Sequence, residues 1–108
     1  MAIIVYLEPS GRRPFDHWFD RLDPAAAIKV RTALARIELG NLSNAKGVGG
    51  GVLEYRIDYG PGYRVYFGRD GDALVILLGG GTKQRQDEDI AVAQARWLDY
   101  RQRKREPR

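Results

Sequence analysis

Two turn signals, and the alternating residues between them, constrain the fold of this chain most tightly. Gly60-Pro61-Gly62 and Asp70-Gly71 are residue combinations typical of tight turns and hairpins. Between residues 53 and 67 apolar and polar side chains alternate, and residues 73–78 are apolar throughout. Alternation is typical of a strand with one wet face, and a continuous apolar run is typical of a central strand. The sequence therefore predicts three successive antiparallel strands.

The first forty residues predict one strand and two helices. Residues 2–7 are β-branched and aromatic, which favours a buried first strand. Apolar residues at helical spacing predict a short helix over 14–22 that begins at Pro14. A second helix begins at Pro24 and ends at Gly40, so the two are expected to form a helical hairpin.

The other segments complete an α+β fold. Residues 41–51 are expected to form a loop, and Gly79-Gly80-Gly81 is expected to end the last strand. A helix follows from about Asp87, and the charged tail 101–108 is expected to fray. The predicted order is β-α-α-β-β-β-α, with a mostly antiparallel sheet of about four strands. Residues 1–108 suffice for one domain and not for two.

Composition excludes several kinds of site. The chain has no cysteine, which excludes disulfides, thiolate metal sites and a cysteine nucleophile. Its one histidine, His17, lies beside Trp18 with no partner motif, so a surface or packing role is expected. We therefore expect no metal and no cofactor. No apolar run approaches the roughly 20 residues of a membrane span, which predicts a cytoplasmic protein that does not engage a membrane.

Alternation also gathers polar side chains on one face of the first two hairpin strands. If their apolar residues point to the core, the opposite face carries Glu54, Arg56, Arg64 and Tyr66. Two arginines close together across antiparallel strands repel, which a chain can tolerate where an anion lies between them. Alternatively, Glu54 neutralises both in a cross-strand salt-bridge ladder. The formal net charge of +4 mildly favours a polyanionic partner.

More basic and aromatic residues follow near this face. Lys83 comes directly after the glycine run and Thr82, where it is either a presented functional group or a plain exposed cation. The combined set is Arg56, Arg64, Lys83 and Arg85 with the rings of Tyr59, Tyr63 and Tyr66. Cations that pair with phosphates and rings that stack on bases suit single-stranded nucleic acid.

Residues 51–67, GVLEYRIDYGPGYRVYF, resemble the signature of the RelE/ParE toxin superfamily, and more closely its phage-derived, HigB-like addiction module killer protein branch. Stretches 15–22, 38–41, 77–83 and 86–90 agree with that branch. The resemblance covers about residues 3–100 and implies a RelE-like domain. One departure is Ile90, near the place where RelE-type enzymes often carry a tyrosine.

The resemblance implies the toxin of a bacterial type II toxin–antitoxin system. Such a toxin is a ribosome-dependent, metal-independent mRNA endonuclease, in which the 2′-hydroxyl attacks the adjacent phosphate and the 5′-oxygen leaves. Arg64 matches the family's strand arginine and would stabilise the phosphate; Arg56 and Lys83 match two further basic positions. Glu54 or Lys83 is the expected general base. The expected RNA-binding residues are Tyr59, Tyr63, Tyr66 and Arg85.

Two other functions fit the same resemblance. One is a ParE-like toxin that poisons DNA gyrase by binding it without chemistry of its own. The other is a module that only binds an antitoxin and operator DNA as a co-repressor. The implied partners are a cognate antitoxin, expected to be a HigA-like helix-turn-helix protein, the mRNA and ribosome, and operator DNA through the antitoxin complex.

Overall fold

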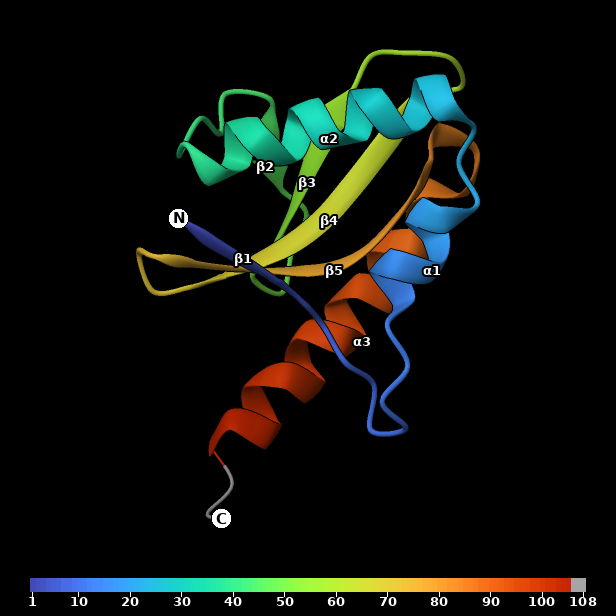
Figure 1. The fold of residues 1–108 in the computed structure, drawn as a ribbon. Coiled ribbons are helices and arrows are strands. Elements are labelled where there is room, and N and C mark those ends of the chain that lie inside the picture. The colour runs from blue at the N-terminus through green and yellow to red at the C-terminus, as the bar shows by residue number, and fades with distance from the viewer. Residues whose placement is uncertain (106–108) are drawn as a thin grey trace.

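Five strands form one mixed sheet in the order β1-β5-β4-β3-β2 (Figure 1). They are β1 (Ala2–Val5), β2 (Ala45–Gly47), β3 (Val52–Ile57), β4 (Tyr63–Asp70) and β5 (Leu74–Thr82). The strands from β2 to β5 pair antiparallel in chain order, and β1 lies parallel to β5. This computed structural model describes residues 1–105. The predicted α+β class is confirmed, although the sheet has five strands rather than about four.

Three helices pack on the sheet. They are α1 (Pro14–Asp20), α2 (Pro24–Glu38) and α3 (Gln86–Arg105), and a short 3-10 turn, η1 (Lys83–Arg85), precedes α3. The α1 helix packs on β5 and α2 packs on β3, and both helices contribute side chains to one hydrophobic core (Figure 1). Asp23 caps α2 by accepting a hydrogen bond from the Ala26 amide at 2.8 Å. No helix in residues 1–105 is long and apolar enough to cross a membrane.

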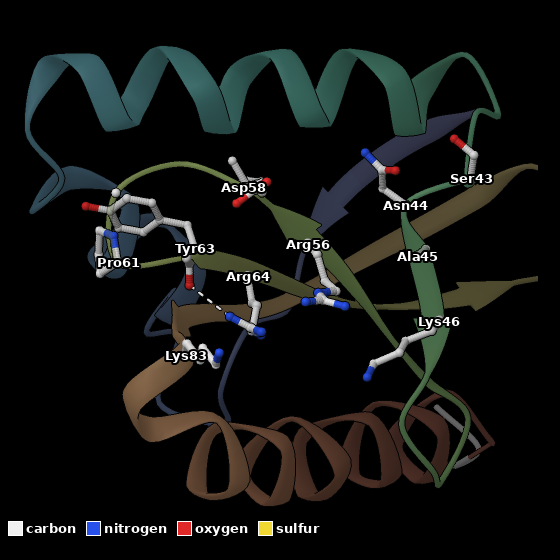
Figure 2. A pocket seen from close by; sticks show the side chains of 13 residues that line it. Ser43, Asn44, Ala45, Lys46, Arg56, Asp58, Pro61, Tyr63, Arg64 and Lys83 are labelled. Atoms are coloured by element: carbon white, nitrogen blue, oxygen red, sulfur yellow. Dashed lines mark hydrogen bonds between the residues drawn. The ribbon is translucent and has the colours of Figure 1, made fainter.

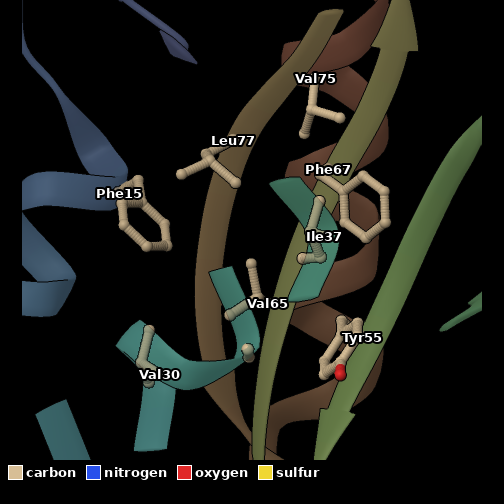
Figure 3. Close-up of a cluster of buried hydrophobic side chains, with 9 residues drawn as sticks. Phe15, Val30, Ile37, Tyr55, Val65, Phe67, Val75 and Leu77 are labelled. Carbon is tan, nitrogen blue, oxygen red and sulfur yellow. The ribbon is translucent and has the colours of Figure 1, made fainter. Parts of the chain in front are cut away.

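Each face of the sheet has its own hydrophobic core. On the α2 face, Val30 and Ile37 pack with Phe15 of α1 against Val65 and Phe67 (Figure 3). On the opposite face α3 packs over β4 and β5, and the core there consists of Tyr6, Val52, Tyr66, Ile76, Leu78, Ala93 and Trp97. Because α3 covers this second face in part, the expectation that it is open to water is wrong at Tyr66 and Glu54, which are 1% and 0% exposed.

The first strand is an edge strand and not a buried one. It pairs with β5 alone, and its residues alternate between exposed and half-buried positions. Ile4 is 46% exposed, whereas Ile3 and Val5 pack against the core on the α2 face. The β-branched composition favoured a strand correctly, but such a composition does not distinguish an edge from a centre.

The three consecutive glycines lie inside β5 and do not end it, contrary to the expectation. Side chains from two helices occupy the space above them. The ring of Trp18 lies on Gly80, and the carboxylate of Asp89 lies on Gly81, so closely that a Cβ atom at either glycine would overlap them. Trp97 lies on Gly68 of β4 in the same way. These glycines therefore admit helix side chains close to the sheet.

Two hydrogen-bonded clusters anchor the C-terminal half of α3. Asp70 accepts hydrogen bonds from Tyr100 Oη at 2.8 Å and from Lys104 Nζ at 2.6 Å. Asp99 accepts hydrogen bonds from Tyr6 Oη at 2.6 Å and from Arg103 Nε at 2.9 Å. The helix accordingly extends to Arg105, so the expected fraying is wrong for residues 101–105, and its remainder, 106–108, lies outside the described residues.

The first prediction concerns Gly80. Replacing it with alanine places a methyl group against the Trp18 ring, and overpacking of this kind lowers the free energy of unfolding by about 2 kcal/mol. Gly47→Ala is the matched control, because a Cβ there meets nothing within 4 Å. Urea denaturation measures both variants. Equal stability of the two variants would contradict the packing of Trp18 on this strand.

The second prediction concerns pH. The hydrogen bond from Lys104, and then that from Tyr100, lowers the pKa of Asp70 below its ordinary value. Stabilisation by a carboxylate with a lowered pKa is present above about pH 4 and is lost as the pH falls through its folded-state pKa. Asp70→Asn should therefore lower Tm at pH 7, with the difference from wild type closing at acid pH. Asp72→Asn on the same turn is the control, and a difference that does not change with pH would contradict this assignment.

Candidate nucleic-acid interface

A cleft of about 660 Å³ opens beside the N-terminal end of α3 (Figure 2). We call it the cationic cleft, because its lining includes the basic side chains of Lys46, Arg56, Arg64 and Lys83. Its other lining residues are Ser43, Asn44, Ala45, Ile57, Asp58, Gly60, Pro61, Gly62 and Tyr63. Among these residues, Asp58 supplies the one carboxylate. The cleft is therefore strongly positive.

Strand register brings the basic residues together. Arg56 of β3 pairs directly with Arg64 of β4, and in the adjacent row Lys46 pairs with Glu54, which pairs with Tyr66. Residues two apart on a strand share a face, so both rows project to the same side of the sheet. The predicted common face is confirmed. Lys83 reaches the cleft from η1, and the backbone amide of Lys83 donates a hydrogen bond to the Gly62 carbonyl at 3.0 Å.

The position of Arg64 is fixed by its neighbours. Its guanidinium Nη1 donates to the Gly62 carbonyl at 3.0 Å, and its Nε lies 3.6 Å from Glu54 Oε2. The residue is 4% exposed, yet its guanidinium points into the cleft rather than into a hydrophobic core (Figure 2). Arg64 is thus a preorganised cation at the wall of the cleft.

Glu54 lies beneath the cleft and does not line it. Its carboxylate accepts hydrogen bonds from Tyr66 Oη at 3.0 Å and from Gln86 Nε2 at 2.9 Å, in addition to the ion pair with Arg64. Its carboxylate has no exposure to solvent and does not line the cleft, which is where a general base would have to meet a ligand. The structure therefore does not bring Glu54 to the position that the expected role as a base requires. Glu54 is a positioning residue for Arg64.

The expected RNA-binding residues divide into three groups. Tyr63 lines the cleft. The ring of Tyr59 stacks on the ring of Tyr63, with centroids 6.5 Å apart and an interplanar angle of 21°. Tyr66 is buried, so its ring offers no stacking surface to a base. Burial and the nearby Glu54 carboxylate also raise the pKa of Tyr66 well above the ordinary value. Arg85 lies outside the cleft lining and pairs with Glu88 at 2.6 Å.

The two arginines resolve the alternatives that the sequence left open. Glu54 pairs with Arg64, whereas Arg56 is exposed and forms no ion pair within residues 1–105. A ladder in which one carboxylate neutralises both arginines is therefore not present. Directly opposed like charges destabilise a sheet, so the stability of the fold alone does not favour an arginine at position 56.

Sequence reasoning missed Lys46 and Asp58. Lys46 lies in a strand of three residues, which is too short to display a period, and its glycine-rich surroundings favoured a loop. Asp58 was visible only as a polar residue of the alternating pattern. Within residues 1–105 no three histidine, aspartate or glutamate side chains gather as ligands for a metal ion.

These observations define the class of protein as an α+β domain with a cationic cleft at one end of its sheet. No family model matches the chain. The chain is 44% identical over 80 residues to an uncharacterized protein of Haemophilus influenzae, and the aligned region covers 73% of this chain and 81% of that protein. The chain belongs to the same family as this protein.

The third prediction separates the contributions of Glu54 and Arg56, the two charged neighbours of Arg64, to stability. Glu54→Gln leaves a nearly buried guanidinium without its counter-charge and should lower the free energy of unfolding by about 3 kcal/mol. Arg56→Gln should change it by less than about 0.5 kcal/mol or raise it, because an unpaired repelling charge is removed. Urea denaturation checks both. A loss above about 1 kcal/mol in Arg56→Gln would indicate that Arg56 stabilises the fold through a pair.

Proposed function

We propose that this chain is a RelE-like, HigB-like toxin domain that binds mRNA on the ribosome through the cationic cleft and cleaves it. The observation that carries the proposal is the opposed pair Arg56 and Arg64, one free and one fixed, at the wall of a cleft with two lysines. Such a pair is unfavourable for the fold alone and favourable when a phosphate lies between its members. The resemblance of residues 51–67 to the toxin signature supplies the class of reaction.

The proposed reaction is a transesterification within the RNA. The ribose 2′-oxygen bonds to the adjacent phosphorus, the bond from phosphorus to the 5′-oxygen breaks, and a 2′,3′-cyclic phosphate and a 5′-hydroxyl result. The 2′-hydroxyl loses one proton and the leaving 5′-oxygen gains one. Negative charge grows on the phosphoryl oxygens, and Arg64 and Lys83 would stabilise that charge electrostatically. A guanidinium already fixed by Glu54 and Gly62 needs little reorganisation in that step.

Proton transfer would fall to residues that line the cleft. Lys83, Tyr63 and Asp58 line it and carry groups that can exchange a proton. Glu54 would act only through Arg64, because its carboxylate is buried. In this assignment Arg56 and Lys46 bind backbone phosphate, and the stacked rings of Tyr63 and Tyr59 receive a base.

A toxin of this kind needs a partner that holds it inactive. We propose a cognate antitoxin, a HigA-like helix-turn-helix protein, that binds the toxin and through which the complex binds operator DNA. The net charge of +4 and the open cationic cleft support a partner that contributes acidic side chains.

The fourth prediction is made in cells. Induction of the chain should stop growth and translation, and primer extension on cellular transcripts should show new 5′ ends. Arg64→Ala should abolish both effects, and Arg64→Lys should restore little, because a lysine cannot donate to the Gly62 carbonyl and reach a phosphate at once. Arg69→Ala, an exposed arginine outside the cleft lining, is the matched control and should stay fully toxic.

Two outcomes would overturn this function. Equal toxicity of Arg64→Ala, with circular dichroism showing an intact fold, would refute the assignment of the phosphate site. Intact transcripts accompanied by DNA damage and filamentation would favour the gyrase poison instead.

A further inference from the structure

A second hollow, of about 310 Å³, lies between α2 and β3. It adjoins the cationic cleft, because four residues line both hollows, namely Asn44 before β2 and Arg56, Ile57 and Asp58 at the end of β3. The short strand β2 pairs with β3 as far as Tyr55, and the Asn44 carbonyl then accepts a hydrogen bond from the Arg56 amide at 3.2 Å. Beyond Arg56 no described strand pairs with β3 on that side, so a ligand in the cleft can pass over Ile57 and Asp58 into the second hollow.

One face of α2 supplies polar and basic groups to the second hollow. Lys29, Thr32 and Arg36 line it, and their spacing of three and then four residues places them on one side of the helix. Lys29 and Arg36 are exposed, and neither forms an ion pair within residues 1–105. They are separated by about 10 Å along the helix, so one phosphate group does not contact both.

Aromatic rings connect the two hollows. Lys29 Nζ lies 5.3 Å from the centroid of the Tyr59 ring, and Tyr59 stacks on Tyr63 at the cationic cleft. Within the described residues, Asp58 is the one carboxylate that lines the second hollow, against Lys29, Arg36 and Arg56. The continuous surface thus alternates cations and rings, which is the arrangement that tracks a single strand of nucleic acid.

We propose that α2 is a second part of the RNA-binding surface. An RNA strand held in the cationic cleft crosses the end of β3 and continues along α2, where Lys29 and Arg36 each bind one further phosphate. Thr32 and Asn44 offer uncharged hydrogen-bonding groups to the strand between them. This inference depends on the proposed function for the identity of the ligand, and it adds a site that lengthens the bound segment.

The test measures how affinity depends on strand length. Fluorescence anisotropy with the full chain would use 2′-O-methyl oligoribonucleotides of about 4 and about 12 nucleotides, which lack the attacking hydroxyl. The double variant Lys29→Ala, Arg36→Ala should weaken binding of the long strand about tenfold and make its log–log salt dependence shallower by about 1.4, as expected for two phosphate contacts to a single strand. Binding of the short strand should change less than about twofold.

The matched control removes the same charge elsewhere. Arg69 and Arg105 line a separate hollow between the β4–β5 hairpin and the end of α3. The double variant Arg69→Ala, Arg105→Ala should therefore leave both affinities and both salt slopes nearly unchanged. Alanine is a strong helix former, so exposed substitutions on α2 preserve the fold. The charge-reversed variant Lys29→Glu, Arg36→Glu should weaken long-strand binding further.

The outcomes separate this inference from the function on which it depends. If Arg64→Ala weakens both strands and the α2 variants weaken neither, the extended site is refuted and the cleft stands. If the α2 variants weaken both strands equally, their effect is a general loss of charge and the extended site is again refuted. If Arg64→Ala leaves both affinities unchanged, the proposed function fails.

Discussion

The buried ion pair between Glu54 and Arg64 is the interaction on which the candidate site depends. A carboxylate without solvent exposure needs hydrogen-bond donors and a counter-charge, and here they come from Tyr66, Gln86 and Arg64. Arg64 is placed at the wall of the cleft by this ion pair together with the hydrogen bond from its Nη1 to the Gly62 carbonyl. Arg56 has no such constraint and remains exposed beside it.

The packing of α3 on the sheet makes this pair possible. The α3 helix covers only part of its face of the sheet, so that Glu54 is buried while Arg56 is exposed to solvent. Close packing of helices depends on glycines: Gly68 and Gly80 admit the rings of Trp97 and Trp18, and Gly81 admits the carboxylate of Asp89. Bulky residues at Gly68 or Gly81, the two positions that contact α3, would push that helix away from the sheet and uncover Glu54.

Local patterns allowed part of this structure to be predicted. The alternation around two turns predicted β3 and β4 and the common face of Arg56 and Arg64, because both depend on residues close in the chain. The burial of Glu54 and Tyr66 depends on α3, which begins at Gln86, 32 residues after Glu54, and no local pattern reports that contact. Glycine is equally suited to a turn and to a close contact, so the sequence of the glycine run in β5 does not show where the strand ends. A three-residue strand shows no period, which left Lys46 outside the predicted site.

The account's central claim is that a fixed arginine and its neighbouring cations form a phosphate site in the cleft. NMR titration of the labelled chain with a 2′-O-methyl RNA oligonucleotide tests it most directly, with the Nε–H signal of Arg64 and the backbone amides of residues 62–64 and 81–83 as reporters. The account predicts saturable shifts at these signals and at Arg56, with little change on the outer face of α3. Shifts confined to other surfaces, with the Arg64 signal unmoved at saturation, would contradict it.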